Sequence, residues 1–509
     1  MSTPPPPGTA IPPLAGGVDG SAALRPLLAT VLDALHEGAV ARGGPLPAGG
    51  PDAVAKRLRD AVGPAIPAHG TGAQEALYTL VRALAEGAAD PAEPRCAAHL
   101  HCPPLAVATA ADLAASALNQ SMDSWDQAPA ASALETAVTE AIAAEVYPGT
   151  AATTGTAPRT PPISAPTADL HTSPTTRTAR PTPDALVTTG GTESNQLALL
   201  LARERHGAVQ LICGANAHHS LHRAAWLLGL PEPVTVPAPS GVIDLAALDE
   251  ALTDLHHPLL VAATAGTTDT GRIDPLPEIA DLCARHNAEL HVDAAYGGPL
   301  LFSDTHRDAL EGLDRAQSVT LDLHKLGWQP VAAGLLVVPD RRLLDVLRHQ
   351  ADYLNAEDDT EAGLPDLLGR SLRTTRRPDI LKVAATLRAV GRSGLGDLID
   401  RTLAAARRLA DLVEASPHLE LYERPTLSTV LFRPAPDAAT ASHTATTVAA
   451  TSDETVADIR RTLLTEGRAV LGRARIDGRL WLKATLLNPH TTTSDLEALL
   501  NLLEGRTHR

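Results

Sequence analysis

The sequence predicts an α/β fold built around a mostly parallel sheet, followed by a smaller α+β domain. Between residues 184 and 340, short apolar runs alternate with segments of helical periodicity. Such runs are typical of parallel strands that helices bury on both faces. Seven runs are present: DALVTT, AVQLIC, PVTVP, PLLVAATAG, ELHVDAA, SVTLDL and GLLVVP. Ligands bind at the carboxyl ends of strands in such sheets, so functional residues should follow these runs.

Composition divides the rest of the chain into parts. Two stretches rich in Thr, Pro and Ala, 149–183 and 434–454, cannot bury enough apolar surface to order themselves, so we expect a flexible insertion and a flexible loop. The expected order is a disordered N-terminus, a helical segment, the insertion, a large ligand-binding domain and a small C-terminal domain. Their expected bounds are 1–20, 21–148, 149–183, 184–385 and 386–509.

Bulk properties argue against several kinds of partner. The net charge of −17 disfavours nucleic acid or an anionic membrane as the main partner. The chain has no run of about 18 apolar residues for a membrane span. It also has no basic N-terminal region followed by an apolar one, so we expect a cytoplasmic protein. The four cysteines form no CxxC pair, so neither a disulfide framework nor a metal site is expected.

A glycine pair, Gly190 and Gly191, follows the first apolar run, and a helix is expected from near Thr192. Glycine lets the backbone approach a ligand, and a helix N-terminus offers free N–H groups to an anion such as phosphate. The motif is neither GxxxxGK[ST] nor GxGxxG, which weighs against nucleoside triphosphates and dinucleotides. A glycine pair also begins many helices only to turn the chain.

Charged residues follow two later runs. Asp293 ends ELHVDAA, where a buried carboxylate needs a cationic partner such as a protonated ring nitrogen or a metal, unless it is an ordinary strand-end residue. His324 and Lys325 follow SVTLDL, and a lysine there can act as an amine nucleophile toward an aldehyde, or simply lie at the surface. A glycine turn, an acid and a lysine in this order on one sheet favour a single cofactor site.

Two loops add further candidates. His218, in AHHS after AVQLIC, could stack its ring on a planar cofactor or only cap a loop. Thr267 and Thr268, in AGTTDTGRID, could offer hydroxyls to a cofactor oxygen or belong to an ordinary polar loop.

The motifs GGTESN, AHHS, AGTTDTGRID, HVDAAYGG and DLHK, in this order and spacing, resemble the pyridoxal-phosphate-dependent amino acid decarboxylases of the aromatic, glutamate and diaminobutyrate group. ADYLN, SLRTTRRPD and LKATLLNPHTT are especially similar to the bacterial 2,4-diaminobutyrate and siderophore-type lysine decarboxylases. The resemblance covers about residues 95–500, apart from the two Thr/Pro/Ala-rich stretches. It implies the aspartate aminotransferase-like fold (fold type I), pyridoxal 5′-phosphate (PLP) as the cofactor, and a homodimer with active sites at its interface. The helical segment 21–148 is expected to contribute to the dimer and to the substrate pocket.

The resemblance also implies roles for single residues. Lys325 would hold the cofactor as a Schiff base, Asp293 would pair with the ring nitrogen, and His218 would stack on the ring and assist proton transfer. The remaining cofactor contacts implied are Gly191 and Thr192 at the phosphate with Asp322 and His324 nearby, Thr268 at the phenolic oxygen, and Ala295 beneath the ring.

The implied reaction removes the α-carboxylate of an L-amino acid as carbon dioxide and protonates Cα. Members of the aromatic and glutamate branches usually bring a loop tyrosine to Cα, but residues 355–369 contain none. Tyr353, just before this stretch, a histidine or water is therefore expected to give the proton. Slow protonation would let dioxygen intercept the carbanion and drive oxidative deamination.

Four polar residues in LNQSMDSWDQAP are candidates for substrate binding: Asn119, Ser121, Asp123 and Asp126. A carboxylate there could pair with a distal ammonium, which favours 2,4-diaminobutyrate, ornithine or lysine, although both acids could instead cap helices.

Other functions stay open from the sequence. They are decarboxylation of glutamate or an aromatic amino acid, oxidative decarboxylation with deamination, transamination, and a non-catalytic role in assembly or regulation. The intact Lys325, Asp293 and His218 argue against the last.

Overall fold

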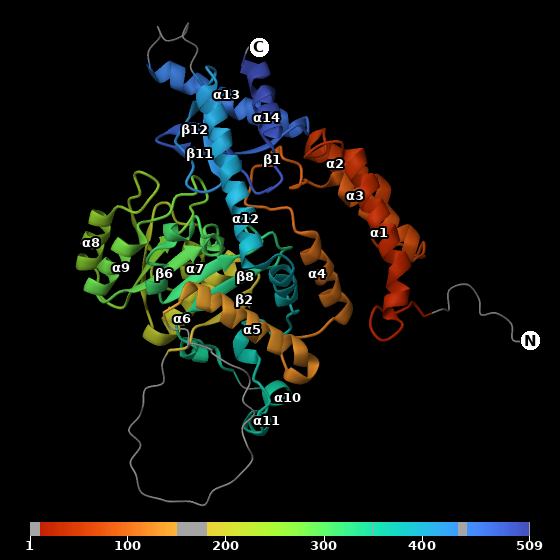
Figure 1. Cartoon of the computed structure of the whole chain (residues 1–509), viewed down its shortest axis with the longest axis vertical. Helices are drawn as coiled ribbons and strands as arrows, with labels where there is room; N and C mark the ends of the chain where they lie inside the picture. The colour runs from red at the N-terminus through yellow and green to blue at the C-terminus, as the bar shows by residue number, and fades with distance from the viewer. Residues whose placement is uncertain (1–10, 150–180, 350, 436–444, 508–509) are drawn as a thin grey trace, which may run out of the picture.

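The computed structural model describes residues 11–149, 181–349, 351–435 and 445–507 (Figure 1). Most of the expected insertion, half of the expected disordered N-terminus and the middle of the expected loop 434–454 lie outside these ranges. Figure 1 shows a central sheet with helices around it, a second sheet near the C-terminus, and α12 running from one to the other.

The central sheet contains all seven predicted strands, in the order β2-β8-β7-β6-β5-β3-β4. Strands β3 to β7 pair in parallel, whereas β8 is antiparallel to both β7 and β2. The prediction of a mostly parallel seven-stranded sheet is confirmed. The bounds are β2 Asp184–Thr188, β3 Gln210–Gly214, β4 Val234–Val236, β5 Leu259–Thr264, β6 Glu289–Ala294, β7 Ser318–Asp322 and β8 Gly334–Val338.

The apolar runs are continuous because both faces of the sheet are covered. Successive side chains of a strand point to opposite faces. In β5, Val261 and Ala263 enter a core shared with α5, α9 and α12, whereas Leu260 and Ala262 enter a core shared with α6 and α7. The helices around the sheet are α5 Pro129–Val146, α6 Gly191–His206, α7 Ser220–Leu227, α8 Leu245–Asp254, α9 Leu276–Arg285 and α12 Ile380–Ala415.

The expected N-terminal helical segment forms α1 Gly20–Arg42, α2 Gly50–Val62, α3 Ala73–Gly87 and α4 Ala106–Leu118, followed by α5. Helices α1 and α3 pack against each other and, with α2, form a layer at the side of the molecule (red in Figure 1). Leucines on α1 and α3 remain exposed in the chain by itself: Leu32, Leu35, Leu80 and Leu84.

The second sheet has the order β1-β11-β12-β10-β9 and is covered by α12, α13 Ala445–Thr465 and α14 Thr493–Thr507. The strands are β1 Cys96–Ala97, β9 Leu419–Leu421, β10 Thr429–Pro434, β11 Val470–Ile476 and β12 Arg479–Thr485. These strands and helices confirm that the C-terminal part of the chain is α+β. The expected boundary at 385/386 falls inside α12, shortly before a kink at Gly391 (φ 71°, ψ 175°).

Part of the expected loop 434–454 is helical instead. Residues 445–454 form the first turns of α13. The carboxylate of Asp453 accepts a hydrogen bond from Leu480 N (2.8 Å) and lies 3.0 Å from the guanidinium of Arg475, so β11 and β12 hold this part of the helix in place. Composition alone did not indicate these tertiary contacts.

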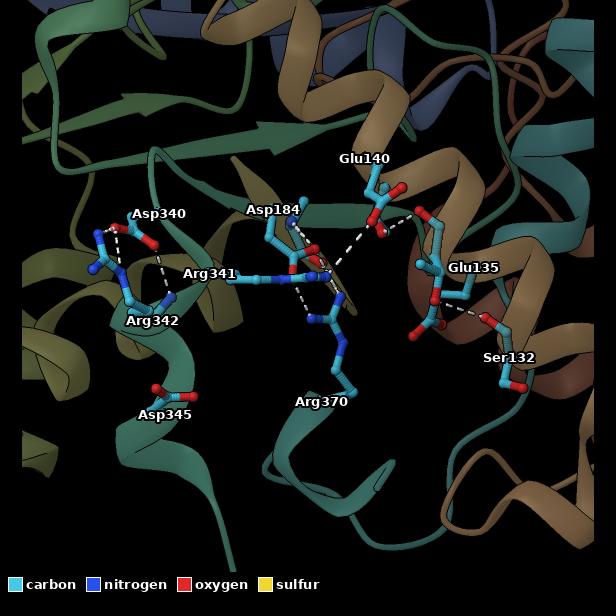
Figure 2. A network of polar contacts seen from close by, with 12 residues as sticks. Ser132, Glu135, Glu140, Asp184, Asp340, Arg341, Arg342, Asp345 and Arg370 are labelled. Atoms are coloured by element: carbon cyan, nitrogen blue, oxygen red, sulfur yellow. Dashed lines mark hydrogen bonds and ion pairs between the residues drawn. The ribbon is translucent and has the colours of Figure 1, made fainter. Parts of the chain in front are cut away.

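A group of ion pairs fixes the first residue of β2 (Figure 2). The buried carboxylate of Asp184 accepts two hydrogen bonds from Arg370, at 2.5 and 3.0 Å, and lies 3.9 Å from Arg341. Arg370 also donates to Ala185 O (2.6 Å), and Arg341 lies 3.5 Å from Glu140. These contacts hold the edge strand that leads into the glycine turn.

Arg370 begins a segment in which four arginines each pair with an acid on a different element. We call residues 370–377 the arginine strap. The pairs are Arg370 with Asp184 on β2, Arg373 with Glu193 on α6, Arg376 with Glu135 on α5, and Arg377 with Asp112 on α4. The Arg376–Glu135 pair is buried and doubly hydrogen-bonded, at 2.6 and 2.7 Å. The strap therefore joins the N-terminal helices to the central sheet.

Candidate active site

A cavity of about 380 Å³ lies at the carboxyl ends of the central strands. Its walls come from the turn after β2, the loops after β3 and β5, and the residues that follow β6 and β7. All of the cofactor contacts expected from the sequence line this one cavity: Lys325, Asp293, His218, Gly191, Thr192, Thr268, Ala295, Asp322 and His324. The parallel strand order explains this meeting, because the ends of β5, β6 and β7 are neighbours in the sheet.

Gly190 and Gly191, which form the turn after β2, keep space open beside the cavity that larger side chains would fill. A Cβ on Gly190 would lie 2.9 Å from Cε1 of His324, and Gly190 has a φ of +156°. A Cβ on Gly191 would lie 2.9 Å from Cβ of Ala295. Helix α6 begins here, and its first amides have no acceptor within the helix, although the amide of Gly191 donates to Asp322 Oδ2 (3.2 Å). The turn therefore suits a bound phosphate.

The carboxylate of Asp293 is 5% exposed at the end of β6. Its oxygens accept hydrogen bonds from Asn195 Nδ2 (2.8 Å) and Ala295 N (3.1 Å). Among the described residues, no Lys, Arg or His makes an ion pair with it. A buried carboxylate requires such a partner, and a protonated ring nitrogen in the cavity would supply it.

Lys325 differs from the other lysines of the chain. Lys56 pairs with Asp60, Lys382 with Asp112 and Asp379, and Lys483 with Asp269. In the described part of the chain, Lys325 alone of the four has no ion-pair partner, and it lines the cavity. Its amine is therefore free to react with an aldehyde.

His218 follows β3 and lies beside the cavity with a fixed ring. Its Nδ1 is 2.8 Å from Ser220 Oγ and accepts a hydrogen bond from Ser220 N (3.3 Å). Burial lowers the pKa of His218, and the neighbouring His219 and Lys325 lower it further, whereas Asp293 opposes the shift. His218 therefore stays neutral to a lower pH than a free histidine.

The two threonines proposed after β5 separate in the structure. Thr268 lines the cavity, but Thr267 is turned into its own loop, where its hydroxyl lies 2.8 Å from Thr270 Oγ1 and accepts from Arg272 N. Lys483 Nζ donates to Thr268 O (3.1 Å) and so holds this loop from β12.

Three residues near the cavity were missed by the sequence analysis: Thr264, Asn195 and Lys483. Thr264 also lines the cavity, and its buried hydroxyl has no hydrogen-bond partner among the described residues. A cofactor oxygen would satisfy it, which is a further sign that the cavity suits a polar ring. Asn195 gave a weak signal in advance, as a polar residue on the buried side of a helix.

A buried network extends from Asp293 into the core. Oδ1 of Asn195 accepts from Thr320 Oγ1 (2.7 Å) and lies 3.1 Å from His291 Nε2, while His291 Nδ1 lies 2.9 Å from Ser318 Oγ. Burial lowers the pKa of His291 to about 4. His291 is therefore a neutral, fully hydrogen-bonded core residue at neutral pH.

The other predicted site residues do not line the cavity of their own chain. Tyr353 is 82% exposed. Asn119 and Asp126 are exposed on the loop after α4. Asp123 is 6% exposed and accepts from Gln127 Nε2 (2.8 Å), and Ser121 Oγ is buried without a hydrogen-bond partner in the described chain.

The described ranges contain no group of three or more His, Cys, Asp or Glu side chains that could hold a metal ion. None of the helices in these ranges combines the length and apolar character that a membrane span needs.

Comparison with known proteins gives matches over the same region. A family model described as "Pyridoxal-dependent decarboxylase conserved domain" matches residues 163–435. The L-2,4-diaminobutyrate decarboxylase of Rhizobium meliloti (strain 1021) is 39% identical over 458 residues, which cover 87% of this chain and 84% of that protein. The enzyme of the same name from Acinetobacter baumannii is 31% identical over 477 residues, covering 87% and 86%.

A solved structure matches nearly the whole chain. The crystal structure of the glutamate decarboxylase domain of diaminobutyrate-pyruvate transaminase and L-2,4-diaminobutyrate decarboxylase from Vibrio parahaemolyticus superposes with a TM-score of 0.79 at 30% identity. The superposition covers 97% of each chain.

The lowered pKa of His291 predicts a specific dependence of stability on pH. Between pH 6.5 and about 4, the unfolded chain binds a proton at this histidine that the folded chain refuses. The free energy of unfolding should therefore decrease as the pH is lowered from 6.5 to about 4, and His291 should account for roughly 3 kcal/mol of this decrease. Denaturant unfolding of wild type and His291→Gln at several pH values checks it. The variant should lose that part of the pH dependence, and equal slopes for both proteins would contradict the prediction.

Proposed function

Because the chain belongs to the pyridoxal-dependent decarboxylase family, we propose that it removes the α-carboxylate of a diamino acid, with L-2,4-diaminobutyrate as the first candidate. The fold is that of fold type I, the enzyme is an amino acid decarboxylase, and its cofactor is PLP. The observation that carries the substrate is the 39% identity to an L-2,4-diaminobutyrate decarboxylase over 87% of this chain. Asp123 and Ser121 give it structural support.

We assign the cofactor to the cavity at the strand ends. Lys325, without an ion-pair partner in the described chain, would bind its aldehyde, and Asp293 would pair with its ring nitrogen. Gly191 and Thr192 at the start of α6 would hold the phosphate. Further contacts would come from Thr268, Ala295, Asp322 and His324, which line the same cavity.

When bound, PLP supplies an electron sink for the electron pair left behind as the carboxylate departs as carbon dioxide. The carboxylate of Asp293, fixed by Asn195 and Ala295, would stabilise a positive charge on the adjacent ring nitrogen. His218 has its Nδ1 engaged by Ser220, which leaves Nε2 to exchange a proton near the substrate. For Cα protonation, His218 lines the cavity of its own chain, whereas Tyr353 does not and would act only at the cavity of a second copy. His218 is therefore the first candidate.

The loop after α4 supports the choice of a diamino acid. Asp123 is a buried carboxylate that pairs with no cation among the described residues, and there the buried hydroxyl of Ser121, two positions earlier in the chain, has no hydrogen-bond partner. Both groups would be satisfied by an ammonium from outside the chain. Asn119 and Asp126 are the exposed members of the same loop. Since none of them lines the cavity of its own chain, this loop would serve the cavity of a second copy.

A homodimer accounts for that arrangement. The layer of α1 and α3 exposes Leu32, Leu35, Leu80 and Leu84, and α4 exposes Leu113 and Leu118. Exposed leucines on two helices that pack against each other, α1 and α3, suit an interaction surface, and these helices precede the loop that holds Asp123. We also propose a cytoplasmic location, which agrees with the four free cysteines.

The proposed reaction is tested with purified holoenzyme and a panel of amino acids. L-2,4-diaminobutyrate should give carbon dioxide and 1,3-diaminopropane in equal amounts, with a higher kcat/KM than ornithine, lysine, glutamate or aromatic amino acids. Mass spectrometry of the products and an oxygen electrode provide the measurement. Aldehyde and hydrogen peroxide as the main products, or a preference for glutamate, would contradict the proposal.

The role of Asp123 predicts a selective change. Asp123→Asn keeps the shape of the side chain but removes its charge, so KM for the diamino acid should rise about 10- to 100-fold, the worth of a charge-assisted hydrogen bond. The KM of a neutral amino acid of similar length, measured on the same preparation, serves as the internal control. Equal changes for both substrates would remove Asp123 from the substrate site.

A further inference from the structure

Asn195 uses every hydrogen-bonding position of its side chain, although it is completely buried in the first turns of α6. A primary amide has two N–H donors and an oxygen with two lone pairs. Nδ2 donates to Asp293 Oδ2 and to Ser220 Oγ, both at 2.8 Å. Oδ1 accepts a hydrogen bond from Thr320 Oγ1 (2.7 Å) and lies 3.1 Å from His291 Nε2. One side chain thus contacts four polar groups on β6, β7 and α7.

The orientation of this amide follows from its surroundings. Turning it over would bring Oδ1 against the carboxylate of Asp293, so that two acceptors would face each other. Because a carboxylate cannot donate, Asp293 requires Nδ2 on its side. Oδ1 then faces His291, which must donate from Nε2 and therefore accepts at Nδ1, where Ser318 Oγ lies 2.9 Å away. The low pKa of His291 agrees with this neutral form.

The direction of the bonds continues to His218. Ser220 Oγ accepts a hydrogen bond from Asn195 Nδ2, so the hydroxyl hydrogen of Ser220 is available to Nδ1 of His218, which lies 2.8 Å from Oγ. The Ser220 N–H donates to the same nitrogen at 3.3 Å. Nδ1 of His218 is therefore an acceptor, and the proton of the neutral ring resides on Nε2.

We infer that Asn195 is a positioning residue that sets two active-site groups at once, the carboxylate of Asp293 and the Nε2–H form of His218. It does not line the cavity, and it acts through Asp293 directly and through the Ser220 hydroxyl. The inference deepens the proposed function and rests on it, because it gives a reason for the geometry of two groups assigned to the cofactor.

Three variants separate the effect of Asn195 on Asp293 from its effect on His218 through Ser220. Asn195→Leu is nearly isosteric and removes all four hydrogen bonds. Ser220→Ala removes only the hydroxyl between Asn195 and His218 and leaves the Asn195–Asp293 bond in place. Thr402→Val is the matched control, since Thr402 is equally buried but its hydroxyl bonds Leu398 O within α12, away from the cavity.

Two measurements report these two effects separately and do not depend on enzyme turnover. The first is the dissociation constant of PLP, from absorbance titration of the apoenzyme. The second is the ¹⁵N signal of His218 Nδ1 in protein labelled with ¹⁵N-histidine, identified by its loss in His218→Gln. An unprotonated ring nitrogen resonates well downfield of a protonated one.

Asn195→Leu should weaken PLP binding about 10- to 100-fold, because Asp293 loses one of its two donors, and should move the Nδ1 signal toward the protonated position. Ser220→Ala should move that signal while PLP binding stays near wild type, and Thr402→Val should change neither. Wild-type values for Asn195→Leu, or an unchanged signal in Ser220→Ala, would overturn the inference.

A fourth variant, Asp293→Asn, distinguishes a failure of this inference from a failure of the proposed function. If Asp293→Asn binds PLP weakly while Asn195→Leu binds it like wild type, the positioning role alone is wrong. If Asp293→Asn also binds like wild type, the assignment of Asp293 to the ring nitrogen fails, and the role of Asn195 toward it fails as well.

Discussion

A buried carboxylate without a cationic neighbour in the described chain is the constraint around which the site is arranged. Asp293 ends β6 between two parallel strands, where an unpaired charge is costly. Two hydrogen bonds hold it but do not neutralise it. The cavity beside it contains Lys325, the lysine that no acid in the described chain engages. An aldehyde-bearing ring with a protonated nitrogen satisfies both groups together, and PLP is such a molecule.

The fold supports this arrangement from two sides. In the core, Asn195 links α6, β6, β7 and α7 through a directional set of hydrogen bonds that reaches both Asp293 and His218. Outside this core network, the arginine strap pairs with acids on α4, α5, β2 and α6. Its partner Glu193 also accepts from Thr189 N (2.6 Å), next to the glycine turn. Movement of the turn is therefore opposed by contacts on both sides.

Much of this was predictable from the sequence, for a physical reason. Strands buried on both faces must be apolar throughout, so the seven runs were visible, and the polar residues after them had to meet at one edge of a parallel sheet. The cofactor contacts of the cavity followed from that rule and from the family motifs. The two-residue strand β1 carries no periodicity, and the start of α13 depends on contacts of Asp453 with β11 and β12, so neither was predictable. The hydrogen bond from Lys483 to Thr268 joins β12 of the second sheet to a loop of the central sheet, so it depends on how the two sheets lie relative to each other. Nothing in the sequence around Tyr353 indicated that its side chain is exposed.

The most direct test of the account is reduction of the holoenzyme with borohydride, followed by peptide mapping. The account predicts a reduced pyridoxyl adduct on Lys325, in stoichiometric amount and on no other lysine. The chain makes this decisive, because its other three lysines are each held by an acid. An adduct on Lys56, Lys382 or Lys483, or none in protein saturated with PLP, would contradict the central claim.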